Sequence, residues 1–463
     1  MLSIGVIAAW RELNKNIAPF KKGPDYIDAG WLALAAGRPC YNLDSFLLED
    51  SQIFNSFISH TNPGDIAVIE GNRGLYDGLD VQGSTSTAEL AKLLNIPVIL
   101  ILDCTKSTRT MAATLLGCIK FDEDVKIKGV LLNRVAGTRH EKILRGSIER
   151  YCKIPVVGAI PKLGKQSFPE RHMGLIPTAE HSWALESISA AAKIAKTHMD
   201  LDALEKIAQP NTEIETKKPG TEISLHLNEI ETLHAMPNDS KEKVKIGILK
   251  DSAFQFYYPE NIEALTLLGA KIIFLSPLSD KTIPQIDALY IGGGFPETHA
   301  AELEKNRDFK NRIKYLAEDG LPIYAECGGL MYLGDKLIIG EKTYKMSGVL
   351  PIKFGLSKKP QGHGYTIVNV EEENPFFKKG TKIKGHEFHY SKVLHWAENS
   401  KSSKHKLVFS MERGAGFINK RDGVCYKNVL ATYTHIHSLG TPAWAAAMVR
   451  NATAYNKKNK KGM

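Results

Sequence analysis

The sequence predicts an α/β fold in two domains, and two observations lead to this prediction. Short runs of Val, Ile and Leu alternate along the chain with amphipathic segments of helix length, which is the pattern of buried parallel strands joined by helices. A polar stretch rich in turn residues interrupts this alternation. We therefore expect a first domain at 1–204, a linker at 205–243, a second domain at 244–455 and a basic tail at 456–463.

The first domain is predicted to be a doubly wound sheet with helices between its strands. Apolar runs place strands at 66–70, 97–103, 129–133 and 156–160. Amphipathic spacing places helices at 86–94, 107–119 and 140–152. In the second domain a strand begins at Val244, a helix is expected at 260–268, and further strands are expected at 271–275, 287–291 and 321–325.

The composition is that of a soluble globular protein, with 43% hydrophobic and 24% charged residues. No apolar run approaches the roughly 20 residues that a membrane-spanning helix needs, and the first residues do not resemble a signal peptide. Six cysteines without a C-x-x-C pair predict neither a zinc site nor a disulfide scaffold, which fits a cytoplasmic protein.

The net charge of +9 is spread along the chain, apart from the short basic tail. We find no sequence motif for reading nucleic acid beside this charge, so a nucleic-acid partner is not expected. A substrate that carries several carboxylates suits a basic surface equally well.

The segment LPIYAECGGLMYLG places Cys327 where an apolar strand meets a helix. A nucleophile at such a turn projects from the sheet edge, and the glycines that follow let backbone N–H groups approach a substrate. The start of the helix also favours a thiolate and predicts a lowered pKa for the cysteine. A small buried cysteine at a tight turn is the alternative that this segment leaves open.

Two other segments of the chain favour a catalytic role for Cys327. In DALYIGGGFPE a strand ends in three glycines, whose backbone can donate hydrogen bonds to an oxyanion on a neighbouring cysteine. In LATYTHIHSLGTPAW, His435 and His437 follow a strand, a position from which a general base can reach a thiol. An ordinary glycine turn and a metal-binding histidine pair are the alternatives.

Two polar clusters stand out in the first domain. KKGPDYIDAGW brings Lys21, Asp25, Tyr26 and Asp28 close together, and AVIEGNRGLYDGLD places Glu70 at a strand end before a loop with Asp77. Carboxylates at such strand ends can hold magnesium, and a lysine supplies charge for a phosphate or carboxylate. Solvated turns, or a strand-end acid paired with an arginine, are the alternatives.

The order GGGFPE, AECGGLMYLG and THIHS resembles the class I-like glutamine amidotransferase domain of the cobyrinic acid a,c-diamide synthase family, which implies a flavodoxin-like fold. The resemblance implies that Cys327 attacks the glutamine amide and that His435 is its base. It also implies oxyanion donors at Gly293, Gly294 and Gly328. Many class I amidotransferases have a glutamate two residues after the histidine, where this chain has His437, so the third member of the triad stays open. The stretches 362–365 and 385–389 also resemble family motifs, although packing explains them equally well.

The N-terminal clusters resemble the domain of the same family that is related to dethiobiotin synthetase, and SAFQFYYPEN (252–261) and PERHMGL (169–175) match as well. The resemblance implies ATP as co-substrate and a magnesium ion held by Glu70 and Asp25. The residues that it places around the nucleotide and the corrinoid polycarboxylate are Lys21, Asp25, Tyr26, Asp28, Asp77 and Asn133.

One departure concerns the phosphate loop. Family members open with a strand and a loop of the form G-x-x-x-x-G-K-S/T, whereas this sequence begins within the helix that follows and contains no such loop. We therefore expect a P-loop-NTPase-like sheet without its first strand, through either a late start site or a true loss. The implied reaction is amidation of the a- and c-carboxylates of cobyrinic acid with ammonia from glutamine. Hydrogenobyrinic acid, nickel-sirohydrochlorin, or a non-catalytic homologue are the alternatives, and a homodimer is an option.

Overall fold

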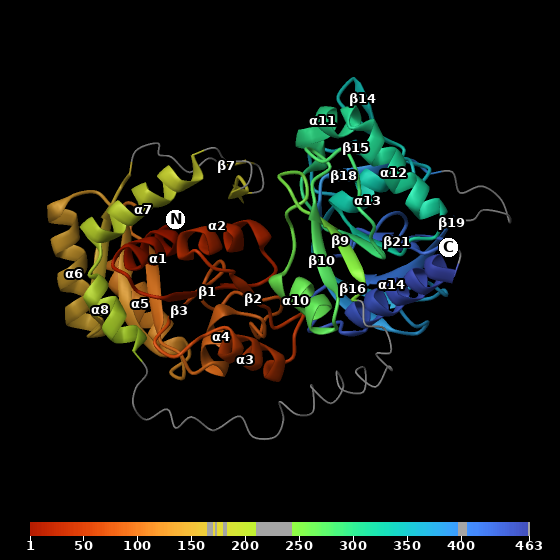
Figure 1. The fold of residues 1–463 in the computed structure, drawn as a ribbon. Helices are drawn as coiled ribbons and strands as arrows, with labels where there is room; N and C mark the ends of the chain where they lie inside the picture. Colours follow the sequence, from red (N-terminus) through yellow and green to blue (C-terminus); the bar gives the residue numbers. More distant parts are fainter. Residues whose placement is uncertain (164–169, 172–173, 179–182, 210–242, 397–404, 462–463) are drawn as a thin grey trace. The chain divides into compact units, whose positions relative to one another are not determined.

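The computed structural model describes residues 1–463 except 164–169, 172–173, 179–182, 210–242, 397–404 and 462–463. The chain forms two compact units, Met1–Gly220 and Thr221–Met463 (Figure 1). The expected linker at 205–243 lies mostly outside the described residues, and helix α8 (Leu201–Ala208) continues past the expected end of the first domain. The matched stretch 169–175 is described only in part.

In the described part of the first unit, six parallel strands form two sheets of three. Each predicted strand is present, and a further pair precedes them. One sheet has the order β2-β1-β3, formed by β1 (Ile17–Lys22), β2 (Tyr41–Leu43) and β3 (Ile66–Glu70). The other has the order β4-β5-β6, formed by β4 (Val98–Asp103), β5 (Ile127–Val135) and β6 (Val156–Pro161).

Two hydrophobic cores lie on opposite faces of the sheet β4-β5-β6. Neighbouring residues of a strand point to opposite faces. In β5, Leu131 belongs to one buried cluster, whereas Val130 and Leu132 belong to the other. This arrangement confirms the doubly wound prediction. The helices are α1 (Leu2–Glu12), α2 (Tyr26–Ala36), α3 (Asp50–Ser59), α4 (Thr87–Leu93), α5 (Thr110–Phe121), α6 (Thr138–Cys152), α7 (Ala184–His198) and α8; a two-residue pair, β7 (Glu170–Arg171) and β8 (Gly174–Leu175), completes the unit.

Strands β3 and β4 each keep one edge without a strand partner in the described part of the chain. Strand β3 pairs only with β1, and β4 pairs only with β5. All five residues of β3 are half-buried, and Ile101 in β4 is 45% exposed. Strands of a parallel sheet are normally buried on both faces, so these two are unusually accessible.

The second unit is built on a nine-stranded sheet with the order β10-β9-β11-β12-β21-β20-β19-β16-β17. The first five strands are parallel, as in a flavodoxin-like sheet, and the remaining four extend it in antiparallel fashion. Their bounds are β9 (Lys245–Leu249), β10 (Lys271–Leu275), β11 (Ala288–Ile291), β12 (Ile323–Glu326), β16 (Gly362–Val370), β17 (Lys382–His389), β19 (His405–Arg413), β20 (Arg421–Tyr426) and β21 (Val429–Thr432).

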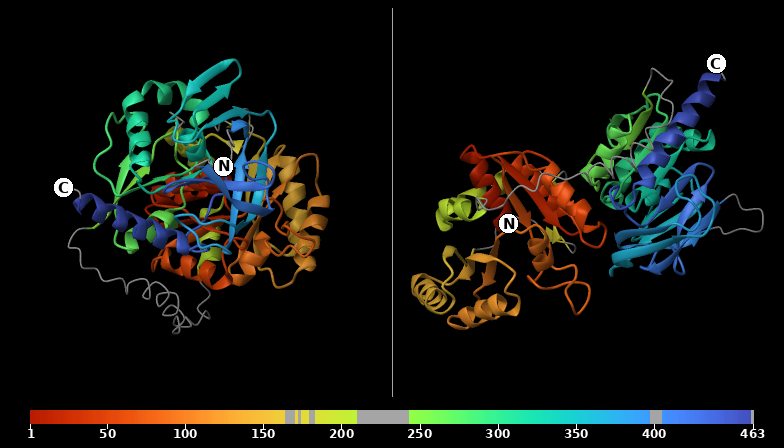
Figure 2. Two further views of the ribbon diagram at one scale, coloured as in Figure 1. Left: turned by 90° about the vertical axis from the view of Figure 1, so that its right-hand side faces the viewer. Right: turned by 90° about the horizontal axis from the view of Figure 1, so that it is seen from below.

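A smaller sheet and six helical segments complete the described part of this unit (Figure 2). The small sheet has the order β14-β13-β15-β18, from β13 (Lys336–Ile339), β14 (Lys342–Lys345), β15 (Ile352–Leu356) and β18 (Ser391–Trp396). The described helices include α10 (Pro259–Leu267), η2 (Pro296–His299), α11 (Ala300–Lys305), α12 (Arg307–Glu318), α13 (Gly328–Leu333) and α14 (Ala443–Lys461). Most of the expected basic tail at 456–463 is therefore the last part of α14.

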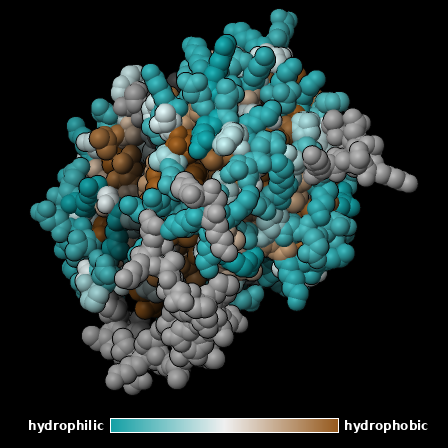
Figure 3. Space-filling model, turned by 45° about the vertical axis from the view of Figure 1, so that its right-hand side comes forward, coloured by the Kyte–Doolittle hydropathy of each residue, from teal (hydrophilic) through white to brown (hydrophobic). Residues whose placement is uncertain are grey.

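The surface agrees with the composition. Hydrophilic residues cover most of the face drawn in Figure 3, with smaller hydrophobic areas between them. Among the residues that the structure describes, no helix has both the length and the apolar character that crossing a membrane requires.

Candidate active site

Cys327 occupies a strained turn between strand β12 and helix α13. Its backbone has φ 47° and ψ −99°, outside the regions that a residue with a side chain normally adopts. The Cys327 N–H donates to the carbonyl of Thr432 at the end of β21 (2.8 Å), which fixes the turn to the neighbouring strand. Strained residues of this kind cluster at active sites. Because β12 ends at Glu326 and α13 begins at Gly328, the predicted position of the cysteine between a strand and a helix is confirmed.

The environment of the thiol differs from the expectation. Burial, followed by the nearby carboxylates of Glu297, Glu326 and Glu387, raises the pKa of Cys327. The predicted lowering by a helix N-terminus was wrong, because α13 has only six residues and the side chain is 5% exposed. The surroundings of Cys327 therefore disfavour the thiolate form.

His435 is held by the residue that directly precedes the cysteine. The parallel pairing of β12 with β21 sets Glu326 opposite Thr432, three residues before His435. Nδ1 of His435 lies 3.2 Å from Oε2 of Glu326, and the N–H of Ile436 donates to the other oxygen at 3.3 Å. With Nδ1 donating to Glu326, Nε2 is the ring nitrogen that carries the lone pair of a base. Sequence reasoning did not identify Glu326, although an acid at the end of a fully buried strand was a usable signal.

The predicted glycines lie against the histidine and the cysteine turn. A Cβ added to Gly293 would stand 2.5 Å from Cε1 and 3.3 Å from Nε2 of His435. A Cβ on Gly328 would stand 3.0 Å from the backbone N of Gly294. The GGG loop, the start of α13 and the imidazole therefore meet at one place, and side chains there would fill the space between them.

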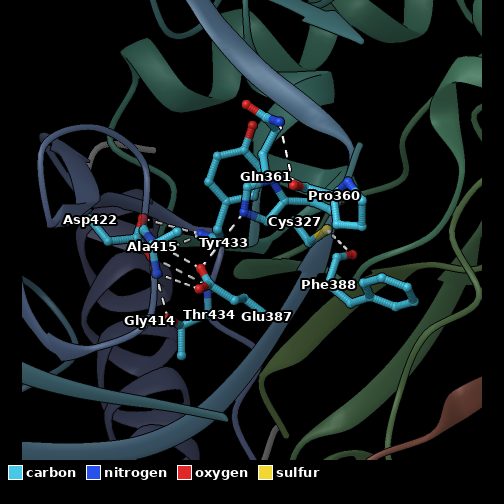
Figure 4. A network of polar contacts seen from close by, with 12 residues as sticks. Cys327, Pro360, Gln361, Glu387, Phe388, Gly414, Ala415, Asp422, Tyr433 and Thr434 are labelled. Atoms are coloured by element: carbon cyan, nitrogen blue, oxygen red, sulfur yellow. Dashed lines mark hydrogen bonds and ion pairs between the residues drawn. The ribbon is translucent and has the colours of Figure 1, made fainter. Parts of the chain in front are cut away.

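Strand β17 passes close to the thiol (Figure 4). The carbonyl oxygen of Phe388 lies 4.0 Å from Sγ of Cys327. The buried Glu387 beside it accepts hydrogen bonds from the backbone N–H groups of Ala415 and Gly416. The stretch 385–389, which packing alone could explain, thus forms one wall around the cysteine.

A second buried carboxylate, Asp422, organises the segment that leads to His435 (Figure 4). It accepts hydrogen bonds from the Thr432 hydroxyl (2.7 Å) and from the N–H groups of Tyr433 (3.1 Å) and Thr434 (3.3 Å). These bonds satisfy the turn after β21, where no strand partner does so. Residue type and spacing did not point to Asp422, because its partners lie at the end of a different strand and after it.

In the first unit, four of the predicted residues form one cluster. The ammonium of Lys21 lies 2.8 Å from Glu70 and 3.1 Å from Asp28. Burial disfavours its charge, but Glu70, Asp28 and Asp25 outweigh burial and raise the pKa of Lys21. Burial, together with Asp28, raises the pKa of Asp25 to about 6. Asp25 also caps helix α2 through the N–H groups of Ile27 and Asp28.

The other predicted residues lie elsewhere in the unit. Tyr26 begins α2 next to the cluster. Asp77 is exposed in the loop after β3 and accepts from the N–H of Gly74. Asn133 is in strand β5 of the other sheet, opposite Asp103. Among the residues described, no group of three or more His, Cys, Asp or Glu side chains is arranged to hold a metal ion.

Comparison with known proteins places these two sites in a family. Residues 245–443 match the model of the CobB/CobQ-like glutamine amidotransferase domain, and residues 48–170 match an AAA domain. The chain is 40% identical over 449 residues to the cobyrinate a,c-diamide synthase of Magnetococcus marinus, covering 97% of this chain and 93% of the relative. It is 39% identical to the enzyme of the same name from Archaeoglobus fulgidus, covering 98% of this chain and 94% of the relative. The chain belongs to the cobyrinate a,c-diamide synthase family.

In this cobyrinate a,c-diamide synthase family member, the two domain matches cover the two sites unequally. Cys327, Glu326 and His435 all lie within the amidotransferase match. Glu70 lies within the AAA match, whereas Lys21 precedes it. The motif order that resembled this family in the sequence is therefore confirmed over nearly the whole chain.

Proposed function

We propose that the protein uses ATP and glutamine to amidate the a- and c-carboxylates of cobyrinic acid. Relatives that carry this name support the proposal, since each aligns over nearly its whole length. The observation that carries it is the arrangement of Cys327 at a strained turn, with His435 oriented by Glu326, inside an amidotransferase domain. A cytosolic location and a homodimer belong to the same proposal.

In the proposed glutaminase reaction, Nε2 of His435 takes the thiol proton while the sulfur of Cys327 attacks the amide carbon of glutamine. The raised pKa of the thiol means that this proton is transferred during the attack and not beforehand. Backbone N–H groups at Gly293, Gly294 and Gly328 stabilise the oxyanion. His435 then gives the proton to the leaving nitrogen, ammonia departs, and water hydrolyses the thioester to glutamate.

In the proposed synthetase reaction, ATP phosphorylates a carboxylate of the macrocycle and ammonia displaces the phosphate. Lys21, with its charge maintained by three carboxylates, would bind a phosphate or substrate carboxylate. Tyr26, Asp28, Asp77 and Asn133 are the other proposed binding residues. Glu70 and Asp25 supply carboxylate oxygens suited to magnesium, which commonly takes one or two protein carboxylates and completes its shell with water and phosphate oxygens. When bound, the ion would neutralise phosphate charge.

The experiment compares nitrogen sources. Wild-type protein is incubated with cobyrinic acid, ATP, magnesium and either glutamine or ammonium. The masses of the products are measured by mass spectrometry. A product carrying two amides is expected from both. Cys327→Ser should lose the product with glutamine and retain it with ammonium. Loss of both would contradict the proposed division of labour.

Parallel incubations separate the alternatives. Hydrogenobyrinic acid and nickel-sirohydrochlorin replace cobyrinic acid in otherwise identical mixtures, and the highest kcat/KM identifies the substrate. Absence of any amide product with every macrocycle and with both nitrogen sources would favour a non-catalytic homologue.

A further inference from the structure

The second histidine of the THIHS segment has its own buried carboxylate. Nε2 of His437 lies 3.5 Å from Oε1 of Glu260, and the two side chains are 1% and 3% exposed. Neither oxygen of Glu260 accepts a hydrogen bond from any residue in the described part of the chain. Nδ1 of His437 accepts from the N–H of Leu439 (3.3 Å), which leaves the ring proton on Nε2, facing Glu260. A buried carboxylate is costly unless it is compensated, and His437 is the group placed to do so.

A continuous series of side-chain contacts leads from this pair to His435. The ring of Tyr258 lies against His437, with 4.6 Å between centroids, and its hydroxyl is 3.3 Å from Nδ1 of His386. The ring of His386 is stacked on His435 at 4.9 Å. Their backbones also exchange two hydrogen bonds, of 2.7 and 3.1 Å. Burial, with His435 and His437 nearby, holds the pKa of His386 well below its usual range, so a neutral ring stacks on His435.

Asn261, the neighbour of Glu260, holds the backbone of the same segment. Its amide nitrogen donates to the carbonyl of Ile436 (3.0 Å), and its amide oxygen accepts from the N–H of Ser438 (2.7 Å). The start of α10 therefore fixes the main chain on both sides of His437, while the carboxylate of Glu260 lies 3.5 Å from Nε2 of the His437 ring. Glu326 lies at the Nδ1 edge of the His435 ring, at 3.2 Å.

We infer that Glu260 is a positioning residue for the base His435 and acts through His437. This inference rests on the proposed glutaminase function. Without the carboxylate, Nε2 of the His437 ring loses the charged group that it faces. The contacts through Tyr258 and His386 that restrict the His435 ring then become looser. A base displaced by a fraction of an ångström transfers protons less efficiently, so kcat falls while glutamine still binds.

A double-mutant cycle tests this inference in the full-length protein. Glu260→Gln and His437→Gln are each expected to lower kcat for glutamine hydrolysis about 10- to 100-fold, with KM changed less than about 2-fold. The kcat of the double variant should equal that of the less active single variant, because both changes interrupt the same series of contacts. Thermal unfolding accompanies each assay; if Glu260→Gln does not fold, the kcat and KM of His437→Gln decide the question.

Three results would overturn the inference. Wild-type kcat in Glu260→Gln or in His437→Gln would show that the pair does not position the base. Multiplicative losses in the double variant would show that Glu260 acts independently of His437. A rise in KM with unchanged kcat would place the pair in substrate binding. If the wild-type protein itself does not hydrolyse glutamine, the proposed function and this inference fail together, whereas an active wild type with unaffected variants removes the inference alone.

Discussion

Oε2 of Glu326 lies 3.2 Å from Nδ1 of His435, although 109 residues separate them in the chain. The contact exists because β12 and β21 are parallel neighbours that end at the same edge of the sheet. The acid that orients the proposed base therefore comes from the residue before the nucleophile and not from the position two residues after the histidine.

Glu326→Gln should lower kcat for glutamine hydrolysis about 100-fold, with KM nearly unchanged. An amide N–H facing Nδ1 of His435 would move the ring proton to Nε2, where it blocks acceptance of the thiol proton. Steady-state glutaminase assays measure the effect. Glu318→Gln is the matched control, since that carboxylate is 48% exposed and pairs with Lys427 in the same unit. Equal activity of the two variants would remove Glu326 from the proposed site.

The raised pKa of Cys327 predicts a thiol that reacts slowly at neutral pH. Because only the thiolate is nucleophilic, alkylation by iodoacetamide should keep accelerating up to pH 9 without a plateau. Removing a nearby negative charge lowers the pKa, so Glu297→Gln should speed labelling at pH 8 about 3- to 10-fold. Labelling of Cys327→Ser gives the background of the other cysteines, and the exposed Glu302→Gln is the control. A plateau near pH 7 would contradict the expected environment.

Gly293→Ala should abolish most glutamine hydrolysis. Its Cβ would stand 2.5 Å from Cε1 of His435, so either the loop or the imidazole must shift. We expect kcat to fall at least about 100-fold while ammonium-driven amidation continues. Gly146→Ala, whose added Cβ meets no atom within 4 Å, should behave as wild type in both assays. Full glutaminase activity in Gly293→Ala would contradict the proposal that His435 acts as the base from its position beside this loop.

Lys21→Met should abolish amidation with either nitrogen source and leave glutamine hydrolysis intact. The change leaves Glu70 and Asp28 without their shared counter-charge, and because both are partly exposed we expect a loss of about 2 kcal/mol in stability. Urea denaturation measures the change in stability, and assays of amidation and of glutamine hydrolysis measure the two activities. Lys15→Met removes an exposed pair with Glu205 and should change little. Retained synthetase activity in Lys21→Met would exclude the lysine from substrate binding.

Local sequence features predicted most of the fold, because strands buried in a parallel sheet carry dense apolar runs. The predicted strand at 66–70 coincides with β3, and the strand at 271–275 coincides with β10. Cys327 was found for a similar reason, since a strand, a nucleophile and two glycines are adjacent in the chain. The glycine loop at 292–294 was likewise predicted from adjacent residues alone.

Contacts between distant segments were not predictable in this way. Glu326, Asp422 and Glu260 each act on the segment 432–438 from another strand or helix, and only sheet order brings them there. The pKa of Cys327 was misjudged because burial outweighs the effect of a six-residue helix. Residue type and spacing do not reveal how deeply a thiol is buried.

The unpaired sides of β3 and β4 have a consequence for handling the protein. Two sheets of three strands present four edges, where one continuous sheet of six would present two. In the described part of the chain, amide protons that point outward from β3 and β4 have no strand acceptor. We expect them to exchange with deuterium faster than those of the central strands β1 and β5. Such edges also invite pairing between molecules, so concentrated solutions should aggregate through this part of the first unit.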